Sequence, residues 1–204
     1  MTQGSTVLTL AILGFLAEEP MHAYELRKRI TDLTGHTRPL SDGAMYPAIK
    51  RARDAGFVER SAESAGRGPT RQVLSLTASG RGELLRRLAG PAEVEITDGG
   101  SFFTLLAFLG QLPDPADQAR VLQRRLDFLT APASFFHRSG TPLRIRDIED
   151  RYRRGMLVMA RATSRAEREW LVETLTELGH PPAQAVPTAE GAPRTEGAPR
   201  HRPS

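Results

Sequence analysis

A mainly α-helical protein in two parts is predicted by three features of the sequence. Residues 1–90 have the order helix, helix, helix, strand, turn, strand, helix. Residues 101–179 contain further apolar and amphipathic helical segments. The excess positive charge lies in the first part, where 13 Arg and Lys stand against 9 Asp and Glu, whereas residues 91–204 have 15 of each. Three helices, a two-stranded wing and a fourth helix form an N-terminal winged helix-turn-helix, and a C-terminal α-helical dimerisation domain is expected to follow.

The first two helices are predicted from their apolar residues and their boundaries. Residues 5–18 are apolar nearly all round, which predicts a buried helix that Ser5 caps. Pro20 is expected to open the second helix, because proline is favoured in the first turn. The inward face of that helix is expected to contain Ile30, Leu33 and either Tyr24 or Leu26.

A third helix is predicted over residues 42–55, with Ser41 as its cap and Gly56 as its end. Pro47 lies early in this helix, where it removes only one or two backbone hydrogen bonds. The helix has two contrasting faces. The face expected in the core contains Met45, Ile49 and Ala52, and the opposite face contains Asp42, Tyr46, Lys50 and Arg53.

The polar face of this third helix is suited to DNA. In a winged helix the third helix enters the major groove with its N-terminal residues near base edges and phosphates. Gly43 and Ala44 are small enough for the backbone to approach, and backbone amides there favour a phosphate. Tyr46 can donate its hydroxyl to a phosphate, and Lys50 and Arg53 can reach phosphate or guanine. The alternative is an ordinary solvated helix face.

The turn between the two predicted strands carries cations. Arg67 and Arg71 flank glycine and proline in the stretch 62–71, an arrangement that suits a DNA backbone or a minor groove. An ordinary solvated hairpin tip is the alternative. Thr77 is expected to cap the fourth helix.

The second part of the chain is expected to hold a dimer together. Residues 91–100 look like a linker, and a long amphipathic helix is predicted over residues 141–179. A helix of that length measures roughly 50 Å, too long to be covered by its own region, so we expect it to pack on a second subunit. Residues 180–204 are rich in Pro, Ala, Gly and Arg, contain EGAPR twice and are expected to be a disordered tail.

The composition argues against several classes of protein. The chain has no cysteine, so disulfides and thiolate metal sites are excluded. Its 5 histidines lack metal-ligand spacing, and no phosphate-binding loop or nucleophile motif occurs, so we expect no metal, no cofactor and no enzyme. Neither a signal peptide nor a membrane-spanning apolar run is visible, and a cytoplasmic location is expected.

Three motifs in order resemble the PadR family of transcriptional regulators: PMHAYEL (20–26), PLSDGAMYPAIKRARDAGFVER (39–60) and GRGPTRQVLSLTASGR (66–81). The resemblance implies a winged helix-turn-helix with a C-terminal helical dimerisation region. It departs from the family pattern at Ala23, Ala44, Ala52, Val73 and Leu74, which affects operator sequence and wing contacts. The matching positions are His22 and Tyr24, then Gly43, Tyr46 and Pro47, then Pro69, Arg71, Leu76 and Thr77.

These observations predict a homodimeric, sequence-specific DNA-binding transcriptional regulator, a ligand-responsive repressor that binds double-stranded DNA at a roughly palindromic operator. The alternative is a winged-helix protein-interaction module without sequence-specific DNA binding. The residues expected to bind DNA are His22, Tyr24, Ser41, Gly43, Ala44, Tyr46, Lys50, Arg53, Arg67, Thr70 and Arg71.

Aromatic residues gather in the second part of the chain. The resemblance implies that some relatives bind phenolic or multidrug-type ligands between helices. A pocket for a small aromatic or hydrophobic effector is therefore expected at the dimer interface, with Phe102, Phe103 and Trp170 in its wall. A plain dimer core is the alternative explanation of the same aromatic residues.

Overall fold

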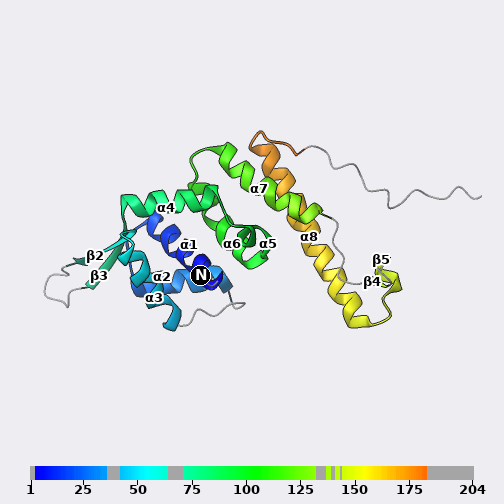
Figure 1. Ribbon diagram of the computed structural model, residues 1–204, viewed down its shortest axis with the longest axis horizontal. Coiled ribbons are helices and arrows are strands. Elements are labelled where there is room, and N and C mark those ends of the chain that lie inside the picture. Colours follow the sequence, from blue (N-terminus) through cyan, green and yellow to red (C-terminus); the bar gives the residue numbers. More distant parts are fainter. Residues whose placement is uncertain are drawn as a thin grey trace, which may run out of the picture.

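A computed structural model of the chain describes residues 3–35, 42–63, 71–131, 137–138, 141–142 and 144–182. Figure 1 shows a small sheet and four helices at one end of the molecule and the two longest helices of the second part at the other. Two shorter helices lie between these groups. The mainly α-helical fold with an N-terminal winged helix is thereby confirmed.

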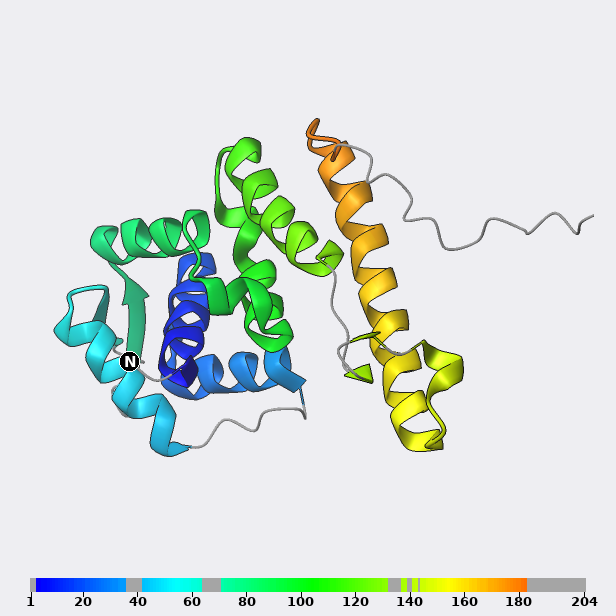
Figure 2. The ribbon, with the colours of Figure 1, turned by 45° about the vertical axis from the view of Figure 1, so that its right-hand side comes forward.

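Helix α1 (Gln3–Glu18) is the central helix of the winged-helix half (Figure 2). Four consecutive residues, 10–13, are each at most 1% exposed, as expected for a helix that is apolar nearly all round. It contacts helices on several sides, which buries most of the described side chains between residues 8 and 16. The helix already begins at Gln3, so the prediction that Ser5 caps it was wrong.

The second helix starts later than predicted. Pro20 does not open it; instead Met21–His22 form a short strand, β1, and helix α2 spans Ala23–Thr34. The extended backbone lets the Met21 side chain enter the core, where it is 5% exposed. Of the two alternatives for the inward face, Leu26 is buried and Tyr24 is 74% exposed.

The predicted wing hairpin is confirmed. Strands β2 (Val58–Glu63) and β3 (Arg71–Leu76) pair antiparallel, with Val58 opposite Leu76 at the base of the hairpin. Strand β1 adds to the free edge of β3, so the sheet has the order β1-β3-β2. The tip of the hairpin, residues 64–70, lies outside the described residues.

Helix α4 (Ala78–Ala89) is capped by Thr77, as predicted. The Thr77 hydroxyl accepts a hydrogen bond from the Gly80 amide at 3.0 Å and donates to the Gly56 carbonyl at 2.7 Å. Gly56 ends the preceding helix with a φ of +73°, a conformation that favours glycine. One threonine therefore joins the start of α4 to the base of the hairpin.

On α4, the Glu83 carboxylate accepts hydrogen bonds from Arg86 at 2.8 Å and Arg87 at 2.7 Å. The Arg86 hydrogen bond is the main cause that lowers the pKa of Glu83 to about 2, and burial opposes it. Since the folded-state pKa lies below the ordinary 4.5, this carboxylate stabilises the fold above that pH. The stabilisation is lost as the pH falls towards about 2.

We therefore expect Glu83→Gln to be less stable than the wild type at pH 7, with a difference that shrinks between about pH 4.5 and about pH 2. Urea unfolding of both proteins across this range measures the difference. A stability difference that stays constant with pH would contradict this account of the ion pair.

The stretch 91–100, expected to be a linker, contains helical structure. Helix α5 spans Glu93–Thr97 and helix α6 spans Gly99–Phe108. Ile96 is 1% exposed, and the Asp98 carboxylate caps α6 through the Ser101 amide at 2.9 Å. Helix α6 packs on α1, and its Phe108 ring lies edge-on to Phe15 with 5.0 Å between centroids. The two halves are thus joined by direct packing.

The last two helices pack along each other. Helix α7 spans Pro115–Thr130 and helix α8 spans Arg151–Glu177. The helix predicted over residues 141–179 thus begins later, because the Asp150 carboxylate accepts from the Arg153 amide at 2.8 Å and caps α8. Before the cap lie a 3₁₀ turn (Ile145–Asp147) and two short paired strands, β4 (His137–Arg138) and β5 (Thr141–Pro142). Within the described residues, no helix has the length and apolar character that a membrane span requires.

Arg125 of α7 joins the helices of the second half. Its Nε and Nη2 donate to both carboxylate oxygens of Glu167 on α8, at 2.6 and 3.0 Å, and Nη1 donates to the Ile96 carbonyl at the end of α5. Its guanidinium lies 4.7 Å from the ring centroid of Phe102 and 5.3 Å from that of Phe128. The side chain is 5% exposed, so this is a buried and paired charge.

Candidate nucleic-acid interface

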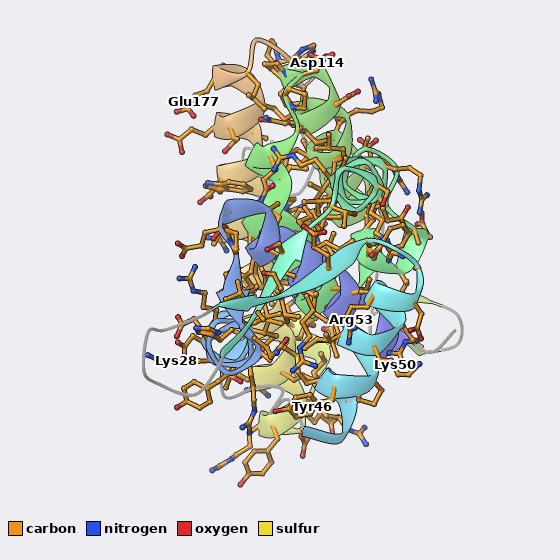
Figure 3. All side chains as sticks on the ribbon, turned by 90° about the vertical axis from the view of Figure 1, so that its left-hand side faces the viewer. Lys28, Tyr46, Lys50, Arg53, Asp114 and Glu177 are labelled. Atoms are coloured by element: carbon orange, nitrogen blue, oxygen red, sulfur yellow. The ribbon has the colours of Figure 1, made fainter. Side chains whose placement is uncertain are left out.

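Helix α3 (Asp42–Asp54) presents the two faces that the sequence predicted. The outer face carries Tyr46, which is 61% exposed, together with the exposed Lys50 and Arg53. Figure 3 shows these three side chains on the same helix at the end of the molecule farthest from α8. The inner face packs Met45, Ala48, Ile49 and Ala52 into the core, each at most 7% exposed.

Pro47 lies inside α3, on the exposed side. Because proline has no backbone N–H, the Gly43 carbonyl one turn earlier receives no helical hydrogen bond from it. Gly43 itself is exposed, so water can satisfy that carbonyl. The helix therefore accommodates the proline directly after Tyr46 without leaving a buried polar group.

Lys50 is held by its own helix. Its Nζ lies 2.6 Å from a carboxylate oxygen of Asp54 one turn later, and both side chains are well exposed. An exposed pair of this kind contributes little to stability. The pair has a larger effect on the binding of a polyanion. Asp54 weakens such binding, because it places a negative charge beside the Lys50 cation that would meet a phosphate.

A small hollow of about 140 Å³ lies between α3 and the wing strands. Its floor is apolar, formed by Ile49 and Leu74, and its rim is polar. Two wing residues on the rim, Arg60 and Gln72, were not predicted. A signal for Arg60 existed: it lies two residues after the buried Val58 on one strand, so both point to the same face of the sheet. The other lining residues are Ala23, Tyr46, Lys50 and Arg53.

The residues predicted at the start of α2 lie beside the wing. The His22 ring Nδ1 donates to the Gln72 carbonyl at 3.0 Å, so this histidine fastens β1 to the wing strand. It precedes α2 without a side-chain capping bond. Tyr24 is highly exposed, and Ala44 is half-buried against the core. Of these three residues, only Tyr24 presents most of its side chain to solvent.

For four of the predicted DNA-binding positions the structure does not describe the side chain. Ser41, Arg67 and Thr70 lie outside the described residues. For Arg71 the structure gives the backbone, which pairs with Glu63 at the outer end of the hairpin. Their contacts with DNA stay predictions.

The three aromatic residues predicted to line an effector pocket differ in how far they are exposed. Phe102 is 0% exposed in the core and lies against Arg125. Phe103, the next residue of α6, is 57% exposed, and Trp170 on α8 is 40% exposed. Within one subunit, Phe102 is thus a core residue, and the other two are surface residues.

Comparisons with known proteins bear on the winged-helix half. Residues 12–86 match the sequence model of the transcriptional regulator PadR-like family. A search of curated proteins found no match.

Solved structures similar to this chain include several regulators. One is a candidate transcriptional regulator from Thermoplasma acidophilum, with 31% identity over 41% of this chain and 78% of that chain and a TM-score of 0.37. Another is Bacillus subtilis PadR in complex with operator DNA, with 22% identity over 84% of this chain and 97% of that chain and a TM-score of 0.40. The PadR-like regulator BC1756 from Bacillus cereus has 18% identity, coverages of 83% and 94%, and a TM-score of 0.38.

The family match extends from within α1 to within α4 and includes the whole three-stranded sheet. It therefore covers α3 and the strands that form the hollow beside it. Residues 12–86 of this chain therefore form a domain of the PadR-like family of transcriptional regulators.

Proposed function

We propose that this protein is a homodimeric transcriptional repressor that recognises a roughly palindromic operator through α3 and the wing. The observation that carries the proposal is the outer face of α3, where Tyr46, Lys50 and Arg53 are exposed together while the inner face is buried. Arg60 on β2 extends this cationic surface across the hollow to the wing. The surface combines positive charge for phosphates with a tyrosine and an arginine for base edges.

Dimer formation would place two such surfaces on one duplex. A two-fold axis relates the two copies of α3, so the half-sites would read as inverted repeats about 10 bp or a multiple apart. The exposed apolar residues of α8 support a second subunit, because Tyr152 and Met159 are 79% and 67% exposed. A repressor acts by occupying such a site in a promoter.

The proposed repressor responds to a small aromatic or hydrophobic ligand. Trp170 and Phe103 offer exposed aromatic surface for it, whereas Phe102 is enclosed in the core. Bound ligand would change the relative angle of the two winged helices. Because Trp170 is the only tryptophan, its fluorescence reports on ligands directly. The absence of any response across a wide panel of phenolic compounds would contradict this part of the proposal.

The proposed function is tested by footprinting of genomic fragments with the purified protein at two salt concentrations. We expect a discrete palindromic footprint for the wild type and a weakened one for Tyr46→Ala, with the dimer retained. Tyr46→Phe separates the hydroxyl from the ring. Binding that ignores sequence and vanishes at physiological salt would instead favour a protein-interaction module. Wild-type affinity in Tyr46→Ala would exclude α3 as the recognition helix.

Substitutions of the two members of the Lys50–Asp54 pair are expected to change DNA affinity in opposite directions. Lys50→Gln should weaken DNA binding and lower the slope of log affinity against log salt by about one. Asp54→Asn should strengthen binding, because it removes a negative charge near the phosphates and releases Lys50. Fluorescence anisotropy with an operator fragment at several salt concentrations measures both effects.

The matched control is Arg120→Gln, which removes the same unit of charge from the exposed surface of α7. It should leave both the affinity and the salt slope nearly unchanged. If Asp54→Asn and Lys50→Gln changed the affinity in the same direction, the role of the pair would be wrong.

A further inference from the structure

Arg125 of α7 reaches three other helices with one side chain. Its guanidinium donates to both carboxylate oxygens of Glu167 on α8, at 2.6 and 3.0 Å. It also donates to two carbonyls at the end of α5, those of Ile96 and Thr97. The same group lies 4.7 Å from the ring centroid of Phe102 on α6. The guanidinium therefore holds α8 directly against the two short helices that lie between the halves of the molecule.

Those two short helices are packed closely on the winged-helix half. Helix α6 lies on α1, where the Phe108 ring meets Phe15 edge-on with 5.0 Å between centroids. A methyl group added to Gly14 of α1 would lie 2.5 Å from the Phe108 ring, so the two helices approach as closely as a glycine allows. Helix α1 packs in turn on α3. The position of α3 is thus tied to α5 and α6 through a close-packed interior.

Helix α8 is attached to α7 by two kinds of contact. Leu171 and Leu175 are at most 1% exposed, and α8 lies beside α7 (Figure 2). Apolar contacts are not directional, so they allow one helix to tilt on the other. A bidentate pair of arginine and carboxylate has a fixed geometry, because two parallel hydrogen bonds must form at once. Arg125 and Glu167 therefore add a directional restraint between α8 and α5.

A small change of angle at Glu167 has a large effect at the start of α8. Arg151, the first residue of this helix, lies about 16 residues earlier, which is about 24 Å at 1.5 Å per residue. A tilt of about 8° would move that end of the helix by about 3.4 Å, the rise of one base pair. A restraint on this angle is therefore a restraint on distances that matter on DNA.

We infer that the Arg125–Glu167 pair sets the angle between α8 and the winged helix, and that this angle selects the separation of the two half-sites. The inference rests on the homodimer and the operator of the proposed function, and it makes Arg125 a positioning residue that does not touch DNA. Without the pair, the two winged helices would adopt a range of separations, so no single spacing of half-sites would be strongly preferred. Stability alone does not explain a buried pair, because an apolar pair of similar size is often as stable.

The angle can be measured within one subunit by two spin labels, because the natural chain has no cysteine. Gly82→Cys on α4 and Arg153→Cys on α8 place the labels at exposed positions in the two halves. The labelled chain is mixed with an excess of unlabelled chain, so that a dimer contains one labelled subunit. Pulsed electron resonance then gives the distribution of distances between the labels. Arg125→Met with Glu167→Leu should broaden or displace this distribution by about 3 Å or more.

Two further variants are compared in the same way. Arg125→Lys keeps the positive charge but lacks the planar fork that joins Glu167 to the end of α5, so it should broaden the distribution too. The matched control Arg120→Gln removes an exposed arginine from the same helix and should leave the distribution unchanged. Circular dichroism identifies the variants that fold. An unchanged distribution in a folded variant of Arg125 would overturn the pair as the restraint.

The effect on DNA is measured with duplexes that carry the footprinted inverted repeat, intact or with one base pair inserted or deleted at its centre. The wild type should lose affinity by about tenfold or more on either change, and the double variant by about threefold or less. A merely structural role for Arg125 would weaken binding to all three duplexes alike, and that result would overturn the inference. A protein without any footprint would instead refute the proposed function, while the distances within one subunit still report on the pair.

Discussion

Arg125→Met is expected to lower the free energy of unfolding by about 3–5 kcal/mol, because it leaves the Glu167 carboxylate buried without its partner. The Glu167 side chain is 12% exposed, so little water can replace the guanidinium. The Ile96 carbonyl at the end of α5 loses its donor at the same time. Urea unfolding of the two proteins at neutral pH measures the loss.

Two further variants separate the buried charge from ordinary packing. Arg125→Met combined with Glu167→Leu should recover much of the lost stability, because replacing both members of a buried pair with apolar residues is often neutral. Arg120→Gln on the same helix removes an arginine that pairs with Asp117 at 2.6 Å on the surface, and should change stability by about 0–1 kcal/mol. If the double variant were less stable than Arg125→Met, the unpaired charge would not be the cause.

The features that the sequence predicted correctly depend on residues close together in the chain. The two faces of α3 follow from helical spacing alone, since Met45, Ile49 and Ala52 recur at three- and four-residue steps. Thr77 caps α4 because its hydroxyl reaches an amide only three residues ahead. Local geometry of this kind depends little on the rest of the fold.

The features that were missed depend on distant residues. Met21 and His22 become a strand only because β3, about fifty residues later, offers a free edge. Arg125 bonds to partners 29 and 42 residues away. With 26 of the 28 cations being arginine, nothing in the sequence distinguished this arginine from its neighbours.

Only the part of the candidate DNA-binding surface that lies on α3 was predicted from the sequence. Tyr46, Lys50 and Arg53 share a helix face and were identified by their spacing. Arg60 and Gln72 lie on two strands that only the hairpin register brings beside α3. The predicted wing contacts were instead placed at the hairpin tip, whose residues carry the composition of a turn.

Gly80→Ala is expected to destabilise the winged helix by about 1–3 kcal/mol or more, through overpacking. A methyl group on Gly80 would lie 2.1 Å from the Phe57 carbonyl oxygen and 2.7 Å from a Leu76 methyl carbon. Backbone atoms cannot rotate away from such a contact, so the first turn of α4 must move. That turn is fastened to Gly56 and Phe57 by the Thr77 hydroxyl, so its displacement strains these hydrogen bonds too.

Gly82→Ala, in the same helix, should have the opposite effect. A methyl group there meets no atom within 4 Å, so the change only improves helix propensity and should stabilise the fold by about 0.5–1 kcal/mol. The two variants have the same composition, and thermal unfolding compares them directly. If Gly80→Ala were as stable as Gly82→Ala, the close approach of α4 to Phe57 would not help to hold the wing beside α3.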